Sequence, residues 1–312
     1  KQRIQKHATS PCSRKNARDS AVSGRPNAHL LTVQEARANF ESDFGGLAKP
    51  DIETARDVII EVRDTQIRGR LYRASNDGVV PLIVYYHGGG WLLGSIDSHD
   101  VLTRRLALSS GFAVLSVDYR RGPESFFPVA VNDAVDAVTW AVKNAQILGI
   151  DPKCVAVAGD SAGGNLATVA AAVLRDEGGP HLAMQILIYP VTTCDLDRGF
   201  DMKYEGHILY RDEMLWHQEN YLSSSDQATD PRVSPLLADL HGLPPAVVVI
   251  AECDPIRPQS ELYIDALKSA GVRVSVYDAP TLVHGFFGLD ELFPEAADAM
   301  DFVAKELKGL ME

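Results

Sequence analysis

From residue 57 onward the sequence alternates short apolar runs, rich in β-branched residues, with longer segments of helical character. The central runs are almost continuous Val, Ile, Leu and Ala, which is typical of strands that are buried on both faces. This alternation predicts an α/β fold in which a mostly parallel sheet is flanked by helices. We expect eight strands, at 57–63, 67–73, 82–86, 112–118, 154–159, 184–189, 246–252 and 272–277.

The composition excludes several classes of protein. In a chain of 312 residues, 46% hydrophobic and 23% charged residues are typical of a globular protein with a sizeable core. The apolar runs are much shorter than the ~20 residues that span a bilayer. A net charge of −12 argues against a broad basic surface for nucleic acid. The four cysteines are scattered without a disulfide or zinc pattern, which predicts reduced thiols and a cytoplasmic location.

Two segments do not follow the alternation, namely residues 1–50 and 192–238. In an open α/β sheet, ligands bind beyond the carboxyl ends of the strands, and inserted segments there usually cover the site. We therefore expect an N-terminal cap segment at 1–50 and a second cap segment at 192–238. The catalytic domain is expected to comprise 51–191 and 239–312.

The sequence Gly-Asp-Ser-Ala-Gly at 159–163 lies where a predicted strand gives way to a predicted helix. It matches the G-x-S-x-G pattern, in which the serine sits on a sharp turn and flanking glycines avoid collision with neighbouring backbone. The motif therefore identifies Ser161 as a candidate nucleophile.

A second motif, His-Gly-Gly-Gly-Trp at 87–91, directly follows the apolar strand predicted at 82–86. A tetrahedral intermediate needs backbone N–H donors, and glycines let the chain approach the oxyanion closely. Such a loop supplies donors beside the N–H of the residue after the nucleophile, here Ala162. The loop lacks the spacing of a phosphate-binding motif.

A serine nucleophile needs a base and an acid that orients the base. His284 follows the last predicted strand, where a chain order of serine, acid and histidine places the base. The loop after the strand at 246–252 offers two acids, Glu252 and Asp254. Asp254 is the better placed because it lies past the strand end, whereas Glu252 alternates to the other side.

Taken together, these motifs resemble those of the hormone-sensitive-lipase family of microbial carboxylesterases. The resemblance rests on residues 87–91, 118–128, 159–165, 254–257 and 284–286, with weaker similarity at 31–37. The chain departs from the family at 121–122, 125 and 258–260, away from the three candidate triad positions.

The resemblance implies an α/β-hydrolase with a helical cap and a Ser161, Asp254 and His284 triad. It also implies an oxyanion hole formed by Gly88, Gly89 and Ala162, and hydrolysis of short-acyl carboxylic esters through an acyl-enzyme. It implies no metal and no cofactor, a small-molecule ester as the partner, and a possible homodimer through the strand at 272–277 and the final helix.

The sequence says less about the substrate than about the catalytic residues. Four aromatic residues lie beside the motifs or in the second cap segment and are candidates for substrate binding: Trp91, Tyr189, His207 and Phe286. An amidase or formamidase would use the same triad, so the leaving group stays open. A ligand-binding receptor of the same fold is a further alternative, although the presence of His284 argues against lost catalysis.

Overall fold

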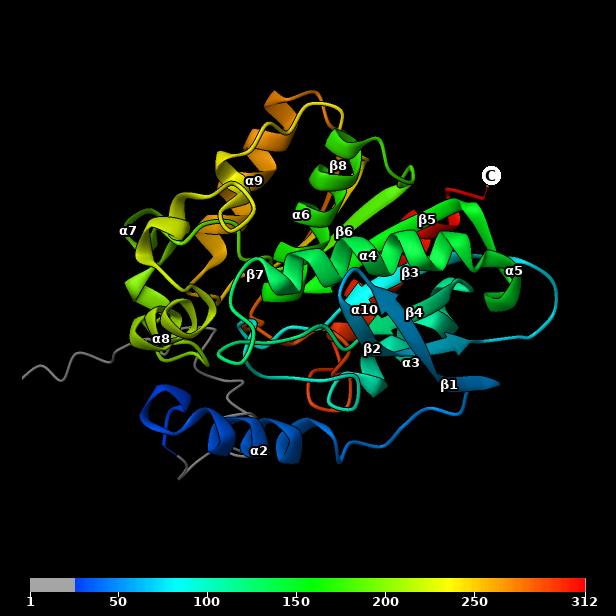
Figure 1. Cartoon of the computed structure of the whole chain (residues 1–312). Helices are drawn as coiled ribbons and strands as arrows, with labels where there is room; N and C mark the ends of the chain where they lie inside the picture. Colours follow the sequence, from blue (N-terminus) through cyan, green and yellow to red (C-terminus); the bar gives the residue numbers. More distant parts are fainter. Residues whose placement is uncertain (1–25, 312) are drawn as a thin grey trace, which may run out of the picture.

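One eight-stranded sheet forms the centre of the computed structural model, which describes residues 26–311 (Figure 1). The strands lie in the order β1-β2-β4-β3-β5-β6-β7-β8, and all neighbours from β4 to β8 are parallel. β1 and β2 are antiparallel to their neighbours. The strands are β1 (Thr54–Val62), β2 (Thr65–Arg73), β3 (Val80–Tyr86), β4 (Ala113–Val117), β5 (Ile150–Asp160), β6 (Met184–Ile188), β7 (Ala246–Ala251) and β8 (Val274–Ala279).

Helices cover both faces of this sheet. Helices α3 and α10 pack together against one face, and α4, α6 and α9 cover the other. The helices are α2 (Val33–Phe44), α3 (Asp100–Ser110), α4 (Val129–Lys143), α5 (Ala145–Leu148), α6 (Ala162–Glu177), α7 (Leu196–Gly199), α8 (Arg211–Tyr221), α9 (Arg257–Ser269) and α10 (Ala296–Lys308). Short 3₁₀ turns are η2 (Ala28–Leu30), η3 (Met202–Tyr204), η4 (Ser225–Thr229) and η5 (Pro235–Leu237).

The alternation of side chains along the strands builds a core on each side of the sheet. In β3, Leu82, Val84 and Tyr86 belong to the α4 and α6 side, whereas Ile83 and Tyr85 belong to the α3 and α10 side. All five are fully buried. Two-sided burial explains why the sequence of this strand is continuously apolar, and it confirms the predicted fold class.

The eight predicted strands are all present, with ends that differ by a few residues. Helices α4 and α5 are separated at Asn144, whose backbone (φ −102, ψ 19) is not helical. Helix α2 was not among the elements that the alternation predicts. It begins at a capping box in which Thr32 and Glu35 exchange hydrogen bonds between their side chains and backbone N–H groups.

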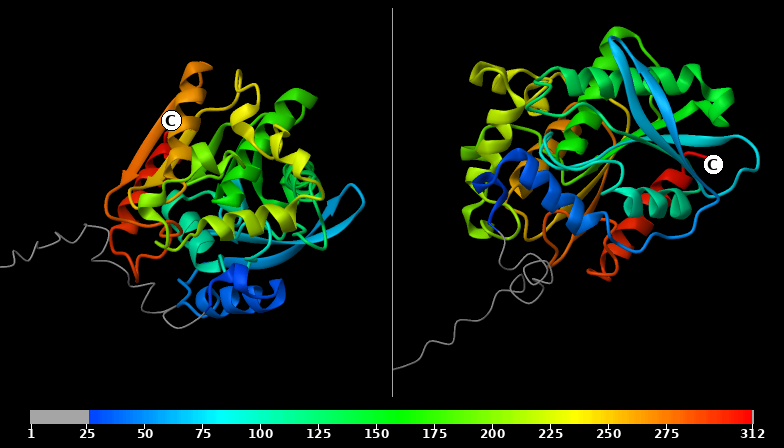
Figure 2. Two further views of the ribbon diagram at one scale, coloured as in Figure 1. Left: turned by 90° about the vertical axis from the view of Figure 1, so that its left-hand side faces the viewer. Right: turned by 60° about the horizontal axis from the view of Figure 1, so that its bottom comes forward.

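Helix α2 lies against the outside of the main body of the fold (Figure 2), and the side chain of Arg37 fixes it there. The Arg37 guanidinium donates to the carbonyl oxygens of Leu92 (2.8 Å) and Gly122 (2.6 Å), and it also binds Glu124. The adjacent turn η2 contacts helix α8, so the two predicted cap segments meet. Residues 1–25 of the first predicted cap segment lie outside the described residues.

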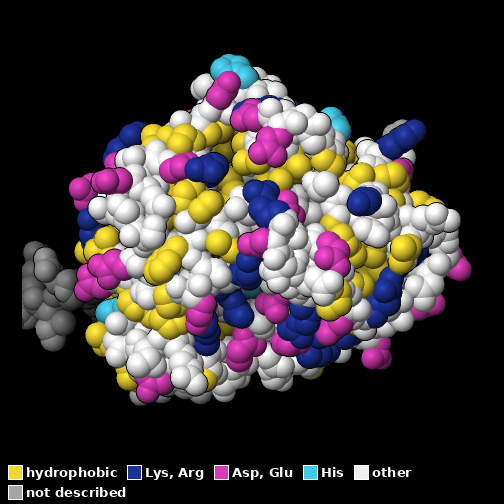
Figure 3. All heavy atoms as spheres, in the orientation of Figure 1, with side chains coloured by type: hydrophobic (Ala, Val, Ile, Leu, Met, Phe, Trp, Pro, Cys, Tyr) yellow, Lys and Arg dark blue, Asp and Glu magenta, His cyan; other side chains and the backbone are white. Residues whose placement is uncertain are grey.

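Several expectations about the surface can be compared with the fold. None of the helices within 26–311 combines the length and the apolar character needed to cross a bilayer. Acidic and basic side chains are interspersed on the face displayed in Figure 3. β8 is an edge strand, and the homodimer expected through it stays a prediction.

The cysteines require a correction. Cys154 and Cys194 carry free thiols, but Cys253 is disulfide-bonded, so the prediction of reduced thiols is wrong for this residue. The scattered spacing of the cysteines could not reveal this, because pairing depends on proximity in the fold. The cytoplasmic location, which rested on reduced thiols, stays a prediction.

We expect Arg37→Ala to loosen helix α2 without unfolding the sheet, because two carbonyl oxygens lose a charged donor. Hydrogen bonds to charged groups contribute about 1.5–3 kcal/mol each, so amide exchange in 33–44 should accelerate by at least about tenfold. The measurement is hydrogen–deuterium exchange by mass spectrometry. Arg56→Ala is the matched control, since Arg56 is exposed and makes one long hydrogen bond, to Ile147. Unchanged exchange in α2 of the Arg37 variant would contradict this docking.

Candidate active site

Ser161 lies between the last residue of β5 and the first residue of α6, at a sharp turn. Its φ of 54° is in the left-handed region, which costs an ordinary side chain free energy. The turn also brings α6 very close to β3: a Cβ at Gly163 would collide with the carbonyl oxygen of Tyr86. Glycine is therefore required at 163, as the motif predicts.

Backbone strain is concentrated around Ser161. Five described residues other than glycine have a positive φ, and four of them line one cavity. These four are Trp91, Ser161, Tyr189 and Ile208. Strained residues persist only where the surrounding structure fixes them, and they cluster at functional sites. Their distribution independently marks this cavity as the candidate active site.

His284 and Asp254 form a buried pair beside Ser161. The Nδ1 atom of His284 lies 2.7 Å from Oδ2 of Asp254, and both side chains are almost completely buried. Asp254 also accepts a hydrogen bond from the N–H of Ile256 (2.9 Å), which fixes the carboxylate. The ring of Tyr189 packs on His284, with a centroid distance of 4.5 Å. His284 and Ser161 line the same cavity.

Glu252, the alternative acid, has a different contact. Its carboxylate accepts a hydrogen bond from the N–H of Thr281 (2.8 Å), three residues before His284. Thr281 has a positive φ of 62°, so this bond secures a strained point in the loop that carries His284. The geometry brings Asp254 and not Glu252 into contact with the imidazole.

The loop at 87–91, called the glycine loop below, differs in one point from the predicted oxyanion hole. The N–H of Gly88 donates to Oδ1 of Asp160 at 2.9 Å, so it is already occupied and is not free to meet an oxyanion. The N–H groups of Gly89 and Gly90 have no acceptor among the described residues, and both glycines line the cavity. The N–H of Ala162 is at the first position of helix α6, where no intrahelical acceptor exists. Sequence alone could not separate Gly88 from Gly90, because the distinction depends on Asp160.

Asp160 holds the glycine loop beside the turn that carries Ser161, which is called the serine turn below. In addition to the N–H of Gly88, it accepts a hydrogen bond from the hydroxyl of Tyr85 (2.6 Å) and lies 3.5 Å from Nε2 of His99. Burial on its own would raise the pKa of Asp160, but His99 and the Tyr85 hydroxyl outweigh it and lower the pKa to about 2. The carboxylate is therefore ionised at neutral pH.

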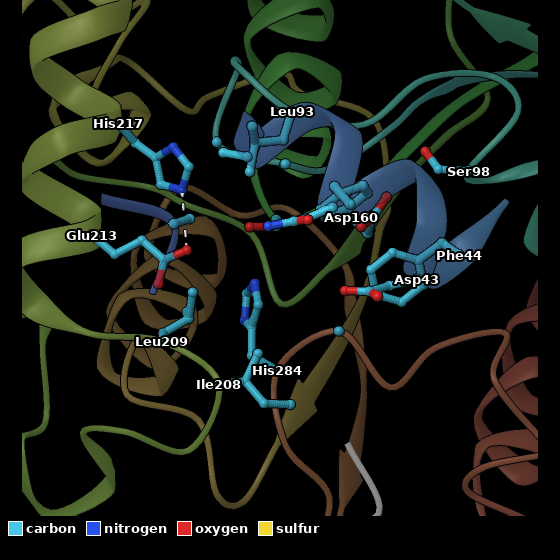
Figure 4. Close-up of a pocket in the computed structure, with 18 of the residues that line it drawn as sticks. Asp43, Phe44, Leu93, Ser98, Asp160, Ile208, Leu209, Glu213, His217 and His284 are labelled. Atoms are coloured by element: carbon cyan, nitrogen blue, oxygen red, sulfur yellow. Dashed lines mark ion pairs between the residues drawn. The ribbon is translucent and has the colours of Figure 1, made fainter. Parts of the chain in front are cut away.

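The cavity around these residues has a volume of about 510 Å³ and is lined mainly by apolar side chains. In Figure 4, His284 and Asp160 lie in its middle. His217 and Glu213, from helix α8, lie on one side, and Phe44, Asp43 and Ser98 lie on the opposite side. Both predicted cap segments thus contribute walls, through η2 and α2 from the first and through 206–217 from the second.

Two of the four predicted substrate-binding residues line the cavity and two do not. Trp91 and Tyr189 line the cavity, whereas His207 and Phe286 are not among the described residues that line it. The side chain of His207 is half-buried, and its Nδ1 atom lies 3.0 Å from the carbonyl oxygen of Tyr204. Phe286 is fully buried in the core on the α3 and α10 side.

Sequence reasoning did not single out His217 and Glu213, although both line the cavity. Their spacing of four residues was the available signal, because residues four apart on a helix share one face. Among the described residues, no group of three or more His, Cys, Asp or Glu side chains is arranged to hold a metal ion.

Comparison with known proteins places this geometry in a family. Residues 83–288 match a family model described as alpha/beta hydrolase fold. Carboxylesterase NlhH of Mycobacterium tuberculosis is 42% identical over 225 residues, which cover 70% of each chain. Ethyl acetate hydrolase of Pseudomonas putida is 37% identical over 90% of this chain and 91% of that protein. A solved hyperthermophilic esterase from Pyrobaculum calidifontis superposes with a TM-score of 0.88 at 38% identity, covering 97% of this chain and 98% of that one.

The low pKa of Asp160 predicts a pH-dependent contribution to stability. Because its pKa is lowered on folding, the contribution is complete above the ordinary value of 3.8 and is lost as pH falls through about 2. We expect Asp160→Asn to lower the free energy of unfolding by about 2 kcal/mol or more at pH 7, and by less at pH 3. Urea unfolding of both proteins at each pH measures the difference.

The control for this experiment is Asp226→Asn, at an exposed position. It should change the free energy of unfolding by less than about 0.5 kcal/mol at either pH. A difference between parent and Asp160→Asn that stays constant or grows from pH 7 to pH 3 would contradict the assigned sign.

Proposed function

The chain belongs to the α/β-hydrolase family of hormone-sensitive-lipase-like carboxylic ester hydrolases, and we propose that it cleaves short-acyl carboxylic esters through an acyl-enzyme on Ser161. The observation that carries the proposal is the buried contact of Asp254 with Nδ1 of His284, beside a cavity that also contains the strained Ser161. A nucleophile, a base and an orienting acid are thus available in one place.

In the first half of the proposed reaction, the Ser161 hydroxyl oxygen bonds to the carbonyl carbon of the ester while His284 takes the hydroxyl proton. Asp254 stabilises the imidazolium and fixes the tautomer with Nδ1–H directed at its carboxylate. The negative charge on the former carbonyl oxygen is met by the N–H groups of Gly89, Gly90 and Ala162. His284 then protonates the leaving alkoxide, and the alcohol departs.

In the second half, water replaces the alcohol. His284 takes a proton from the water as its oxygen bonds to the acyl carbon, and the same N–H groups stabilise the second tetrahedral intermediate. Collapse breaks the bond to Ser161, which recovers its proton from His284, and the carboxylic acid leaves. No step uses a metal or an organic cofactor.

The two segments at 1–50 and 192–238 act in this proposal as a cap over the catalytic domain. Support comes from the described part of the first segment, where Ala28, Ala36 and Phe40 line the cavity, and from Leu209 and Met214 in the second. Apolar walls on both sides of Ser161 suit a small ester and exclude water from the reacting atoms.

Ser161→Ala is expected to abolish ester hydrolysis and labelling by a fluorophosphonate probe while the protein remains folded. Loss of a triad nucleophile costs on the order of 10⁴ to 10⁶ in rate. Mass spectrometry should locate the label on Ser161 of the parent protein. The parent is assayed with p-nitrophenyl esters from acetate to palmitate and with the matching anilides.

We expect the short esters to be cleaved fastest and the anilides slowly. Faster cleavage of the anilides would identify an amidase with the same triad. A parent protein that binds esters, does not hydrolyse them and takes no label would be a receptor of this fold, which would overturn the proposal.

The contacts of the two candidate acids predict different losses. Asp254→Asn should lower kcat by about 10⁴, because the amide cannot stabilise the imidazolium and favours the wrong tautomer of His284. Glu252→Gln keeps an oxygen that can accept from Thr281 and should cost less than about tenfold. The comparison uses kcat at equal thermal stability. A greater loss in the Glu252 variant would assign the acid to Glu252.

A further inference from the structure

His217 and Glu213 form a polar pair on a mainly apolar side of the cavity. Both project from helix α8, one turn apart, toward the space above His284 (Figure 4). Nε2 of His217 lies 3.9 Å from Oε1 of Glu213, which is too far for a direct hydrogen bond. Among the neighbouring lining residues, Ile208, Leu209 and Met214 are apolar, and Tyr210 carries a hydroxyl group. The proposed reaction uses neither member of the pair.

The protonation state of His217 follows from its surroundings. The side chain is buried to more than nine-tenths, and burial, followed by the nearby His284 and His29, lowers its pKa to about 4. At neutral pH the ring is uncharged, with one N–H and one bare nitrogen. Nδ1 is buried without a hydrogen-bond partner, so a proton there would be an unsatisfied buried donor. The carboxylate of Glu213 favours the proton on Nε2, the nitrogen that faces it.

The glycine loop is shaped to admit this histidine. The His217 ring lies against Gly90, where a Cβ would collide with Nδ1, Cγ and Cε1 of the ring. The close approach places His217 beside the loop whose N–H groups are proposed to bind the oxyanion. A substrate group only a few bonds from the scissile carbonyl can therefore reach the pair.

We propose that His217 and Glu213 form a subsite for a hydroxyl group of the substrate, so that the enzyme prefers hydroxylated esters to their deoxy counterparts. This inference rests on the function proposed above and specifies its substrate class. The hydroxyl oxygen accepts a hydrogen bond from Nε2–H of His217, and the hydroxyl proton is donated to the carboxylate of Glu213. One group thus bridges the 3.9 Å between the two side chains, as a water can.

Other polar groups fit this pair less well. The carboxylate of Glu213 would repel a substrate carboxylate. A substrate ammonium group can only donate hydrogen bonds, so it would leave the N–H of His217 without an acceptor. An ether oxygen can accept from His217 but has no proton for Glu213. A hydroxyl group satisfies both partners, and a site built for hydrogen bonding discriminates strongly against an analogue that lacks the group.

The test compares kcat/KM within matched pairs of esters, each value divided by the rate constant for alkaline hydrolysis of the same ester. 2,3-Dihydroxypropyl butyrate and propyl butyrate differ by hydroxyl groups in the alcohol part of the ester. Ethyl 3-hydroxybutyrate, as separate enantiomers, and ethyl butyrate place it on the acyl side. We expect the parent to prefer the hydroxylated member of at least one pair by about tenfold or more. The O-methyl ether of that substrate should lose most of the preference.

Glu213→Met and His217→Phe should each reduce the preference to less than about threefold, because each removes one of the two polar partners. Methionine is close to glutamate in size but has no oxygen to accept the hydroxyl proton, which keeps the test valid even where the larger His217 change disturbs folding. Glu219→Met, on the same helix but exposed, is the matched control and should keep the parent ratio.

The possible outcomes separate the two proposals. Hydrolysis of the deoxy esters with a hydroxyl preference near one on both sides would overturn the subsite and leave the esterase proposal intact. A preference that Glu213→Met does not change would also overturn the subsite. Failure of the parent to hydrolyse either member of any pair, without labelling of Ser161, would reject the esterase proposal itself.

Discussion

The close approach of helix α6 to strand β3 is the constraint on which the rest of the site depends. Gly163 lies so near the carbonyl oxygen of Tyr86 that no side chain fits between them. β3 and β5 are paired up to Tyr86 and Gly159, so the glycine loop and the serine turn leave the sheet side by side. The strained backbone of Ser161 is held at the end of β6, where its N–H donates to the carbonyl oxygen of Ile188 (2.8 Å) and its carbonyl oxygen accepts from the N–H of Val191 (3.1 Å).

Polar contacts around the cavity fix the positions of the glycine loop, the serine turn and the loop that carries His284. Asp160 connects the serine turn to the glycine loop through the N–H of Gly88, and Glu252 secures the loop that carries His284. These carboxylates touch no reacting atom in the proposed reaction. They fix the backbone from which Ser161 and His284 project, and such support determines whether catalytic groups are held within a fraction of an ångström.

The walls of the cavity come from segments outside the strand and helix alternation, and these segments carry its chemical selectivity. Helix α2 is fastened by Arg37 to carbonyl oxygens near the glycine loop, while helix α8 brings His217 against Gly90. The same loop therefore serves the proposed oxyanion and the proposed hydroxyl subsite. A change in α8 can alter substrate preference while the serine turn stays the same.

The sequence by itself determined the eight strands, the mostly parallel α/β class and the motifs around Ser161 and His284. These features follow from local signals, namely the periodicity of apolar residues and the need for glycine at tight turns. It also favoured Asp254 over Glu252 through the alternation of side chains at a strand end. Only the tertiary structure decided that the N–H of Gly88 is bound by Asp160, that His207 and Phe286 do not line the cavity, and that His217 and Glu213 do. Those facts depend on which distant segments meet, and contacts such as that between Gly88 and Asp160, which are 72 residues apart, leave no mark in local spacing.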